Sequence, residues 1–135
     1  MLYCQHWGDI MLAEAFGDAV TIPVSPKSKT QMKQLVSQGL FKEQRDVWRL
    51  GAALGISRGQ KKDVSKRDTF QNINSLDPDG IFAALMLGLY PDNTPKERVA
   101  ILVEHAEWGI EELFHQQEIG ILDFSALAST HKINP

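Results

Sequence analysis

The feature that most constrains the fold is a long stretch of helical apolar spacing in the second half of the chain. Thr94-Pro95-Lys96-Glu97 combines a capping box with proline at the first helical position, which predicts a helix start. The helix should reach about Glu118 and end at Gly120. Apolar residues recur along one face of it, at positions 99, 102, 103, 106, 110, 113 and 114. A stripe of this length must be buried against other elements, so the chain is expected to fold as packed helices.

A strand and a capped helix are expected earlier in the chain. Apolar residues alternate with polar or proline positions over residues 19–24, which is the period of a half-buried strand. Pro23 has no N–H for a ladder hydrogen bond, so this strand should lie at a sheet edge or pair imperfectly. Ser25-Pro26 predicts the N-cap and first turn of a helix that ends near Gly39.

Two further helices are indicated, with a basic loop between them. The first should run from about Lys42 to Leu54 and end at Gly55, and Gly51 on its apolar face would allow another helix to approach closely. Residues 57–75 are expected to form a long basic loop, with a short extended piece near Val64 or Phe70. The second helix should open at Asp77-Pro78, and its nearly uniform apolar character predicts a central, buried position.

These signals predict one mainly α-helical domain, with one short strand followed by four or five helices. Residues 1–17 are interpreted as an N-terminal arm with a short helix near 8–16, and residues 18–135 as the domain. The domain divides into a strand-helix-helix unit over 18–56, the basic loop over 57–75 and C-terminal helices over 76–129. The last of these helices is expected near residues 122–128.

Charge is segregated along the chain although the net charge is only −3. Residues 27–67 hold eleven basic and three acidic side chains, a net charge of +8, whereas the remainder holds three basic and fourteen acidic, a net charge of −11. A basic half predicts a surface for a polyanion such as DNA, and its alternative is a solvated face that the acidic remainder partly cancels. The candidate phosphate-binding residues are Lys33, Lys42, Arg45, Arg49, Arg58, Lys61, Lys62, Lys66 and Arg67.

No motif in the sequence indicates an enzyme. The acidic stripe of Glu104, Glu107 and Glu111 is expected to face solvent, where its carboxylates would titrate alike and serve poorly as an acid–base set. Glu112 and His115 form one Glu-x-x-His pair, and a di-iron site needs two such pairs and two further glutamates. We therefore expect no catalytic residue, no metal and no cofactor. The single cysteine and the absence of a long apolar run predict a cytoplasmic protein without a membrane span.

The order of strand, capped helix, glycine turn and second helix between Val20 and Ile56 resembles a ribbon-helix-helix module. In that fold two chains pair their strands, and outward-facing strand residues read bases in the major groove. The outward positions here would be Thr21 and Pro23, and neither carries the long polar side chain that base reading favours. The resemblance therefore implies the fold more than the recognition of one operator.

A second resemblance covers most of residues 20–128. The segment Phe41-Lys42-Glu43-Gln44-Arg45-Asp46-Val47-Trp48-Arg49-Leu50-Gly51-Ala52-Ala53-Leu54-Gly55 is similar to the core of small proteins encoded with DNA phosphorothioation (Dnd) gene clusters, and residues 104–110 are similar to their late glutamate–alanine–asparagine–glycine segment. Glu107 stands where that segment has its asparagine. The resemblance implies a non-catalytic accessory protein of a bacterial DNA-modification or anti-phage system. A neighbouring small component of these systems binds DNA through lysines as an oligomer.

The sequence thus leads to one main expectation and two alternatives. The main expectation is an accessory protein that binds DNA phosphates without sequence preference, other proteins of the defence system, or both, as a homo-oligomer. One alternative is a ribbon-helix-helix transcriptional regulator or antitoxin. The other is a protein–protein adaptor without DNA affinity, whose acidic helix docks a basic partner.

Overall fold

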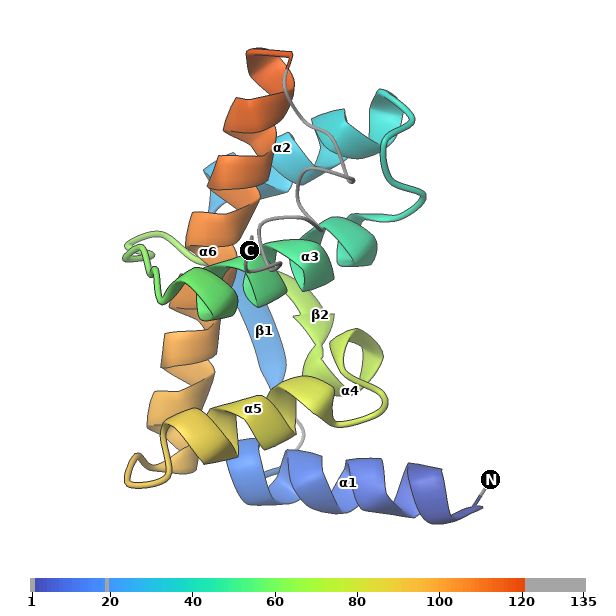
Figure 1. Cartoon of the computed structure of the whole chain (residues 1–135), viewed down its shortest axis with the longest axis vertical. Helices are drawn as coiled ribbons and strands as arrows, with labels where there is room; N and C mark the ends of the chain where they lie inside the picture. The colour runs from blue at the N-terminus through green and yellow to red at the C-terminus, as the bar shows by residue number, and fades with distance from the viewer. Residues whose placement is uncertain (1, 19, 121–135) are drawn as a thin grey trace, which may run out of the picture.

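The computed structural model describes residues 2–18 and 20–120 (Figure 1). Its elements, in chain order, are α1 (Leu2–Phe16), β1 (Thr21–Val24), α2 (Pro26–Ser37), α3 (Gln44–Arg58), β2 (Asp68–Asn72), α4 (Ile73–Leu76), α5 (Ile81–Leu89) and α6 (Pro95–Glu118). The mainly helical fold is confirmed, although the described part has six helices and two strands. The helix expected near 122–128 lies outside the described residues, and none of the described helices is long and apolar enough to cross a membrane.

Helix α6 is the central element of the fold, as its apolar stripe requires. The Thr94 hydroxyl accepts from the Glu97 backbone N–H at 3.1 Å, and the Glu97 carboxylate accepts from the Thr94 N–H at 2.8 Å. The predicted capping box is therefore confirmed, and Gly120 follows the helix with φ +74°. Helices α2 and α3 pack along the C-terminal part of α6, and α1 and α5 lie beside its N-terminal part (Figure 1).

The predicted strand is confirmed as β1, which pairs with β2 in a two-stranded antiparallel sheet. The pairing shifts register between Ile22 and Pro23, as expected for a strand that contains proline. β2 includes the extended piece expected near Phe70, but its five residues were not predicted as a strand because they lack apolar alternation. Ser25 caps α2 by accepting from the Ser28 N–H at 3.0 Å. These contacts place the entrance of α2 beside the sheet.

Helix α3 continues four residues beyond its expected end. Gly55 lies inside the helix, and Gly59 is the left-handed C-cap with φ +63°. The prediction that Gly55 ends the helix is wrong because this glycine serves another purpose: a Cβ there would overlap the carbonyl oxygen of His105 on α6. The close approach predicted at Gly51 is confirmed, since a Cβ at that position would lie 2.9 Å from the backbone nitrogen of Ile110.

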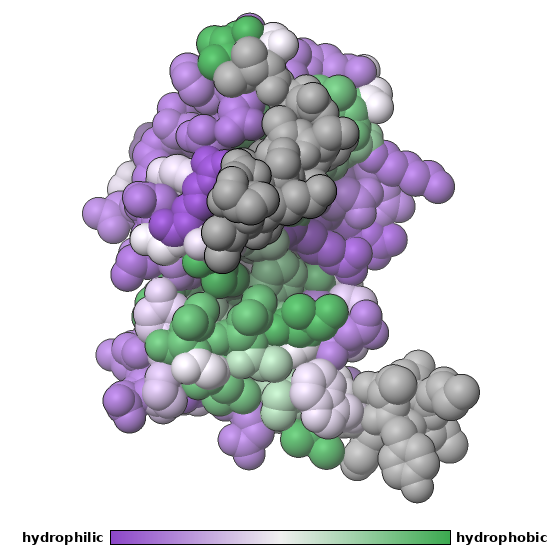
Figure 2. All heavy atoms as spheres, viewed as in Figure 1, coloured by the Kyte–Doolittle hydropathy of each residue, from purple (hydrophilic) through white to green (hydrophobic). Residues whose placement is uncertain are grey.

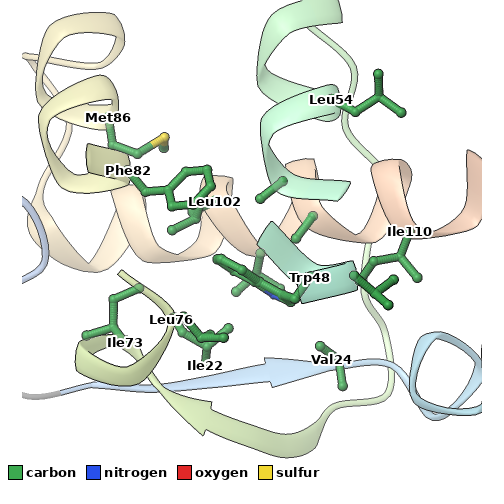
Figure 3. Close-up of a cluster of buried hydrophobic side chains, with 14 of the residues drawn as sticks. Ile22, Val24, Trp48, Leu54, Ile73, Leu76, Phe82, Met86, Leu102 and Ile110 are labelled. Carbon is green, nitrogen blue, oxygen red and sulfur yellow. The ribbon is translucent and has the colours of Figure 1, made fainter. Parts of the chain in front are cut away.

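The core lies where the sheet, α3 and α6 meet, around Trp48 (Figure 3). The Trp48 side chain is fully buried, and its ring meets that of Phe82 edge-on at 5.6 Å between centroids. Other buried side chains drawn around it come from every layer, namely Ile22 and Val24 of β1, Ile73 and Leu76 of α4, and Leu102 and Ile110 of α6.

The outer layer of the fold is formed by α1 and α5, which pack against each other. The segment interpreted as an arm forms α1, whose Leu12, Ala15 and Phe16 are buried. Helix α5 begins at Ile81 rather than at Pro78, and the Asp77 carboxylate reaches forward to accept from the N–H groups of residues 82 and 83 at 3.1 and 2.9 Å. The prediction that this helix is central and buried is wrong, because α6 occupies the centre and α5 keeps one apolar side in solvent.

Candidate nucleic-acid interface

The basic residues at the start of α3 face solvent. Lys42 is exposed, and it precedes the cap residue Glu43, whose backbone N–H donates to the Asp46 carboxylate at 3.1 Å. Arg45 pairs with Glu43 at 2.5 Å, with both side chains about half exposed. An ion pair this exposed contributes little to stability, so Arg45 stays available to another anion.

Arg49 lies on the same helix but is held by the protein itself. Its Nε donates to the carbonyl oxygen of Leu76 at 2.8 Å, and its Nη2 donates to that of Ser75 at 3.1 Å. These are carbonyls at the C-terminal end of α4, where helices leave unsatisfied acceptors. Arg49 therefore links α3 to α4, and its guanidinium is oriented toward the protein.

The end of α3 and the loop after it carry a second group of basic residues. Arg58 and Lys61 are exposed, whereas Lys62 contacts the Glu111 carboxylate of α6. The backbone N–H of Lys62 also donates to the carbonyl oxygen of Glu104 at 3.1 Å, which fixes the loop to α6. Lys62 thus acts as a bridge between the loop and α6, while its neighbours point into solvent.

Three more candidate residues lie outside α3. Lys33 is exposed on α2, and Lys66 is exposed in the loop that leads to β2. Arg67 is exposed as well, although its Nε donates to the nearby carbonyl oxygen of Val64 at 3.4 Å. Over residues 2–18 and 20–120, no hydrogen bond or ion pair is found for the side chains of Lys33, Lys42, Arg58, Lys61 and Lys66.

The two groups on α3 lie at opposite ends of the helix. Arg45 and Arg58 are thirteen residues apart, which corresponds to roughly 20 Å along a helix axis. Hydrophilic side chains cover this half of the molecule, whereas apolar side chains gather over α5 (Figure 2). The structure therefore places these charges in two groups at the two ends of α3 rather than along one helix stripe, and it places Arg67 apart from them, in a pocket with Phe16 of α1 and Lys96 of α6.

The acidic stripe of α6 is not solvated as expected. Glu107 is 5% exposed and accepts from the hydroxyls of Ser25 at 2.6 Å and Ser28 at 2.7 Å. This arrangement places a carboxylate at the N-terminus of α2, where the helix dipole favours negative charge. Glu111 contacts Lys62 and lies 3.9 Å from Lys27. Glu107 and Glu111 therefore hold α2 and the loop to α6.

Two buried side chains of α6 were missed by the sequence reasoning. His105 is 1% exposed, with Nδ1 2.7 Å from the carbonyl oxygen of Gln60 and Nε2 2.9 Å from the Tyr90 hydroxyl. Burial lowers the pKa of His105 below its ordinary value. Arg98 is 6% exposed, and its guanidinium donates to carbonyls at the ends of α1 and α5. Both residues continue the apolar stripe at helical spacing, and a polar residue in such a stripe is the signal that could have revealed them.

The remaining candidate from the sequence is the Glu112–His115 pair of α6. Glu112 accepts from Gln116 on the next turn, and His115 is exposed. Among residues 2–18 and 20–120, no cluster of three or more potential metal ligands is found.

The strand that a ribbon-helix-helix dimer would pair with its own copy is paired here with β2 of the same chain. Comparisons with protein-family models, with curated proteins and with solved structures gave no match to this chain.

Proposed function

We propose that this chain is a non-catalytic accessory protein that binds DNA phosphates through the basic side chains around α3. The observation that carries this proposal is the set of exposed lysine and arginine side chains that have no acceptor in the described part of the chain. Cations of this kind can neutralise phosphates and release the counterions of DNA. Arg49 and Lys62 are committed to protein acceptors, and Arg67 donates to the Val64 carbonyl and lines the same pocket as Lys96. The phosphate contacts are therefore assigned to the unpaired Lys33, Lys42, Arg58, Lys61 and Lys66, together with Arg45 of the exposed pair with Glu43.

The two groups are separated along α3 by more than the width of a DNA groove. About 20 Å separates the ends of α3, and the major groove of B-DNA is about 12 Å wide. Thirteen residues at about 100° each also place Arg45 and Arg58 on different faces of α3, so the two groups would contact separate stretches of the DNA backbone. Contacts to phosphates position a protein on DNA and carry no sequence information directly. The expected mode is therefore binding without preference for one site.

The first experiment is a titration of labelled random-sequence duplex at several salt concentrations. Each lost phosphate contact should lower the slope of log affinity against log salt by about 0.9. We expect this loss for Lys61→Gln, and a drop of about three to four for Lys42, Arg58, Lys61 and Lys66 replaced together by glutamine. Lys96→Gln is the matched control, since Lys96 is also exposed but lies at the start of α6. Equal losses for Lys61→Gln and Lys96→Gln, or no binding at low salt, would reject the proposal.

We further propose that the DNA context is a phosphorothioation or anti-phage defence system, which rests on the resemblance of residues 41–55 to small Dnd-associated proteins. A bacterial strain that carries the gene should lose phosphorothioate linkages, or phage restriction, when the gene is deleted. The wild-type chain should restore modification or restriction, and the variant with all four glutamine substitutions should restore it less. Unchanged modification and restriction after deletion would exclude this context without affecting the DNA-binding result.

A second candidate function, a protein–protein adaptor, is favoured by a different observation. Helix α5 leaves the side chains of Ile81, Leu85 and Leu89 41–58% exposed. Exposed apolar side chains that gather on one surface are typical of interaction sites. Light scattering of the purified protein tests whether that surface joins copies of this chain in a homo-oligomer.

A further inference from the structure

Large apolar side chains are concentrated on the outer layer of the fold. Five of the six exposed large hydrophobic residues found in the described ranges belong to α1 and α5, and the sixth is Ile119 at the end of α6. Those five are Trp7, Ile10, Ile81, Leu85 and Leu89, with exposed fractions of 48, 47, 58, 41 and 54%. Figure 2 shows the apolar side chains gathered over this layer. Five such residues on one layer are more than scattered surface hydrophobics explain.

The two helices form this layer because glycines let them touch. A Cβ at Gly8 of α1 would lie 2.8 Å from the Pro78 carbonyl oxygen, and one at Gly80 would lie 3.0 Å from Met11. On α5, residues 81, 85 and 89 are four apart and form one stripe. The opposite side of α5 is anchored in the core by Phe82, Ala83 and Met86. The exposed stripe is therefore carried on a fixed helix and is ready to receive another element.

Acidic charges predominate around this layer, although Arg49 of α3 lines the same pocket as Asp79 and Ile81, and the buried Arg98 of α6 donates to carbonyls on its inner side. Residues 1–26 and 68–95 contain no lysine or arginine, so the segments that build the layer carry only acidic charges. Asp9 is exposed on α1, Asp79 precedes α5, and Asp92 follows it. A second copy docked through the same patch would place these carboxylates opposite one another, which is unfavourable. An apolar partner with basic flanks would be attracted by the same rim.

We propose that the exposed stripe of α5, together with Trp7 and Ile10 of α1, is the docking surface for an amphipathic helix of a partner protein. The apolar side of that helix contacts Ile81, Leu85 and Leu89, and its lysine or arginine flanks face Asp9, Asp79 and Asp92. In this mode of recognition an amphipathic helix binds through its apolar face, with anchor residues that recur at helical spacing. The proposal rests on the adaptor candidate above and does not depend on DNA binding, which is assigned to basic residues of α2, α3 and the flanking loops.

The test uses an 18-residue dye-labelled model peptide with leucines at i, i+3, i+4 and i+7 and lysines at the remaining positions. The matched probe carries glutamate in place of lysine. Fluorescence anisotropy with the full chain should show at least about tenfold tighter binding of the lysine peptide. Ile81→Glu should weaken that binding at least about tenfold, as loss of an apolar anchor does. Ile119→Glu is the matched control, because Ile119 is 54% exposed at the far end of α6, and it should change affinity less than about twofold.

Several outcomes would overturn the proposal. Equal affinity for both peptides would show that the acidic rim does not attract the partner. Equal losses of affinity in Ile81→Glu and Ile119→Glu would show that the apolar patch is not the binding surface. A dimer seen by light scattering that Ile81→Glu dissociates would make a second copy the occupant, and binding to neutral lipid vesicles that Ile81→Glu abolishes would make it a membrane. Leu89→Glu is the second variant, and thermal melts followed by circular dichroism confirm that each variant is folded.

Discussion

Two helix pairs in this molecule are built on the same device and have opposite outcomes. In the α3–α6 pair, glycines bring the backbones together and the apolar side chains around them are buried, including Trp48 and Ile110. In the α1–α5 pair, Gly8 and Gly80 also allow close approach, between α1 and the turn that leads into α5, yet the apolar stripe of α5 remains in solvent. Close packing of two helices therefore does not by itself determine whether their apolar side chains are buried or exposed.

The difference lies in what covers each pair. The sheet and α4 pack against the α3–α6 crossing, and the apolar side chains between these elements are buried (Figure 3). The α1–α5 pair is the last layer, and α6 covers only its inner side. We therefore expect the α3–α6 pair to contribute most to stability and the α1–α5 pair to provide an exposed surface for binding. Substitutions at matched positions of the two pairs should separate these roles.

The largest effect is expected at the α3–α6 crossing. A Cβ at Gly109 would overlap the carbonyl oxygen of Gly51, and backbone atoms at a helix crossing have little room to shift. Gly109→Ala should therefore lower the free energy of unfolding by about 3 kcal/mol or more, at the upper end of overpacking effects. Chemical denaturation followed by circular dichroism measures the change. A loss below about 1 kcal/mol would show that the crossing adjusts readily.

The matched control lies in the α1–α5 pair. Gly88 is a glycine of α5 whose added Cβ would have no atom within 4 Å. Gly88→Ala should raise the free energy of unfolding by up to about 1 kcal/mol, because alanine has the higher helix propensity. Opposite signs for the same substitution would establish that packing, rather than glycine itself, distinguishes the two pairs.

The next largest loss of stability is expected where the outer layer attaches to α6. Arg98 is buried and donates to the carbonyl oxygens of Tyr90 at 2.9 Å, Pro91 at 3.0 Å and Ala15 at 3.3 Å. Arg98→Met keeps the length of the side chain and leaves these carbonyls without a donor, which should cost about 2–3 kcal/mol. Amide exchange should increase more in α1 and α5 than in α3. A uniform increase over all helices would contradict this division.

Local signals made part of this fold predictable from sequence. The capping box at Thr94, the proline after Ser25 and the alternation over 19–24 are each contained within a few residues, so they identify α6, α2 and β1 correctly. The choice between Gly55 and Gly59 as the end of α3 is different. It depends on the His105 backbone lying against the helix, which no local pattern reveals.

The candidate site was less predictable for the same reason. Arg49 shares a helix with Lys42 and Arg45 in the sequence pattern, but only the tertiary structure brings the α4 carbonyls to its guanidinium. Glu107 follows the spacing of a solvated stripe, and the serines at the start of α2 bury it. Composition gives the sign of the charge on each half, whereas the hydrogen-bond partners decide which charges are free.

A smaller effect is expected where the two regions meet, at His105. This histidine lies beside Gly55 of α3 and contacts Tyr90 after α5. Burial and, less strongly, the charge of Lys61 lower its pKa, which opposes a contribution from the Gln60 carbonyl. The unfolded chain therefore binds a proton more readily than the folded protein. Stability should be full above the ordinary histidine pKa of about 6.5 and should fall as the pH drops below it, by at most about 1.4 kcal/mol per pH unit.

Urea midpoints measured between pH 7.5 and pH 5 follow this loss. His105→Gln removes the titrating group, so the pH dependence of the variant should be flatter than that of the wild type. Parallel curves for the two proteins would assign the pH dependence to other groups.

The smallest effect is expected at Leu85 of α5. It sharpens the comparison most directly when it is measured against the same substitution of a leucine in the enclosed α3–α6 region. Leu102 of α6 is fully buried, and Leu102→Ala should cost about 2–5 kcal/mol. Leu85 of α5 is 41% exposed, so Leu85→Ala should change the free energy of unfolding by no more than about 0.5 kcal/mol. Thermal and urea unfolding of the two variants measure the difference. A cost above about 1 kcal/mol for Leu85→Ala would mean that the stripe supports the fold. A negligible cost, combined with weaker binding of the lysine peptide, would mean that this leucine serves a partner instead.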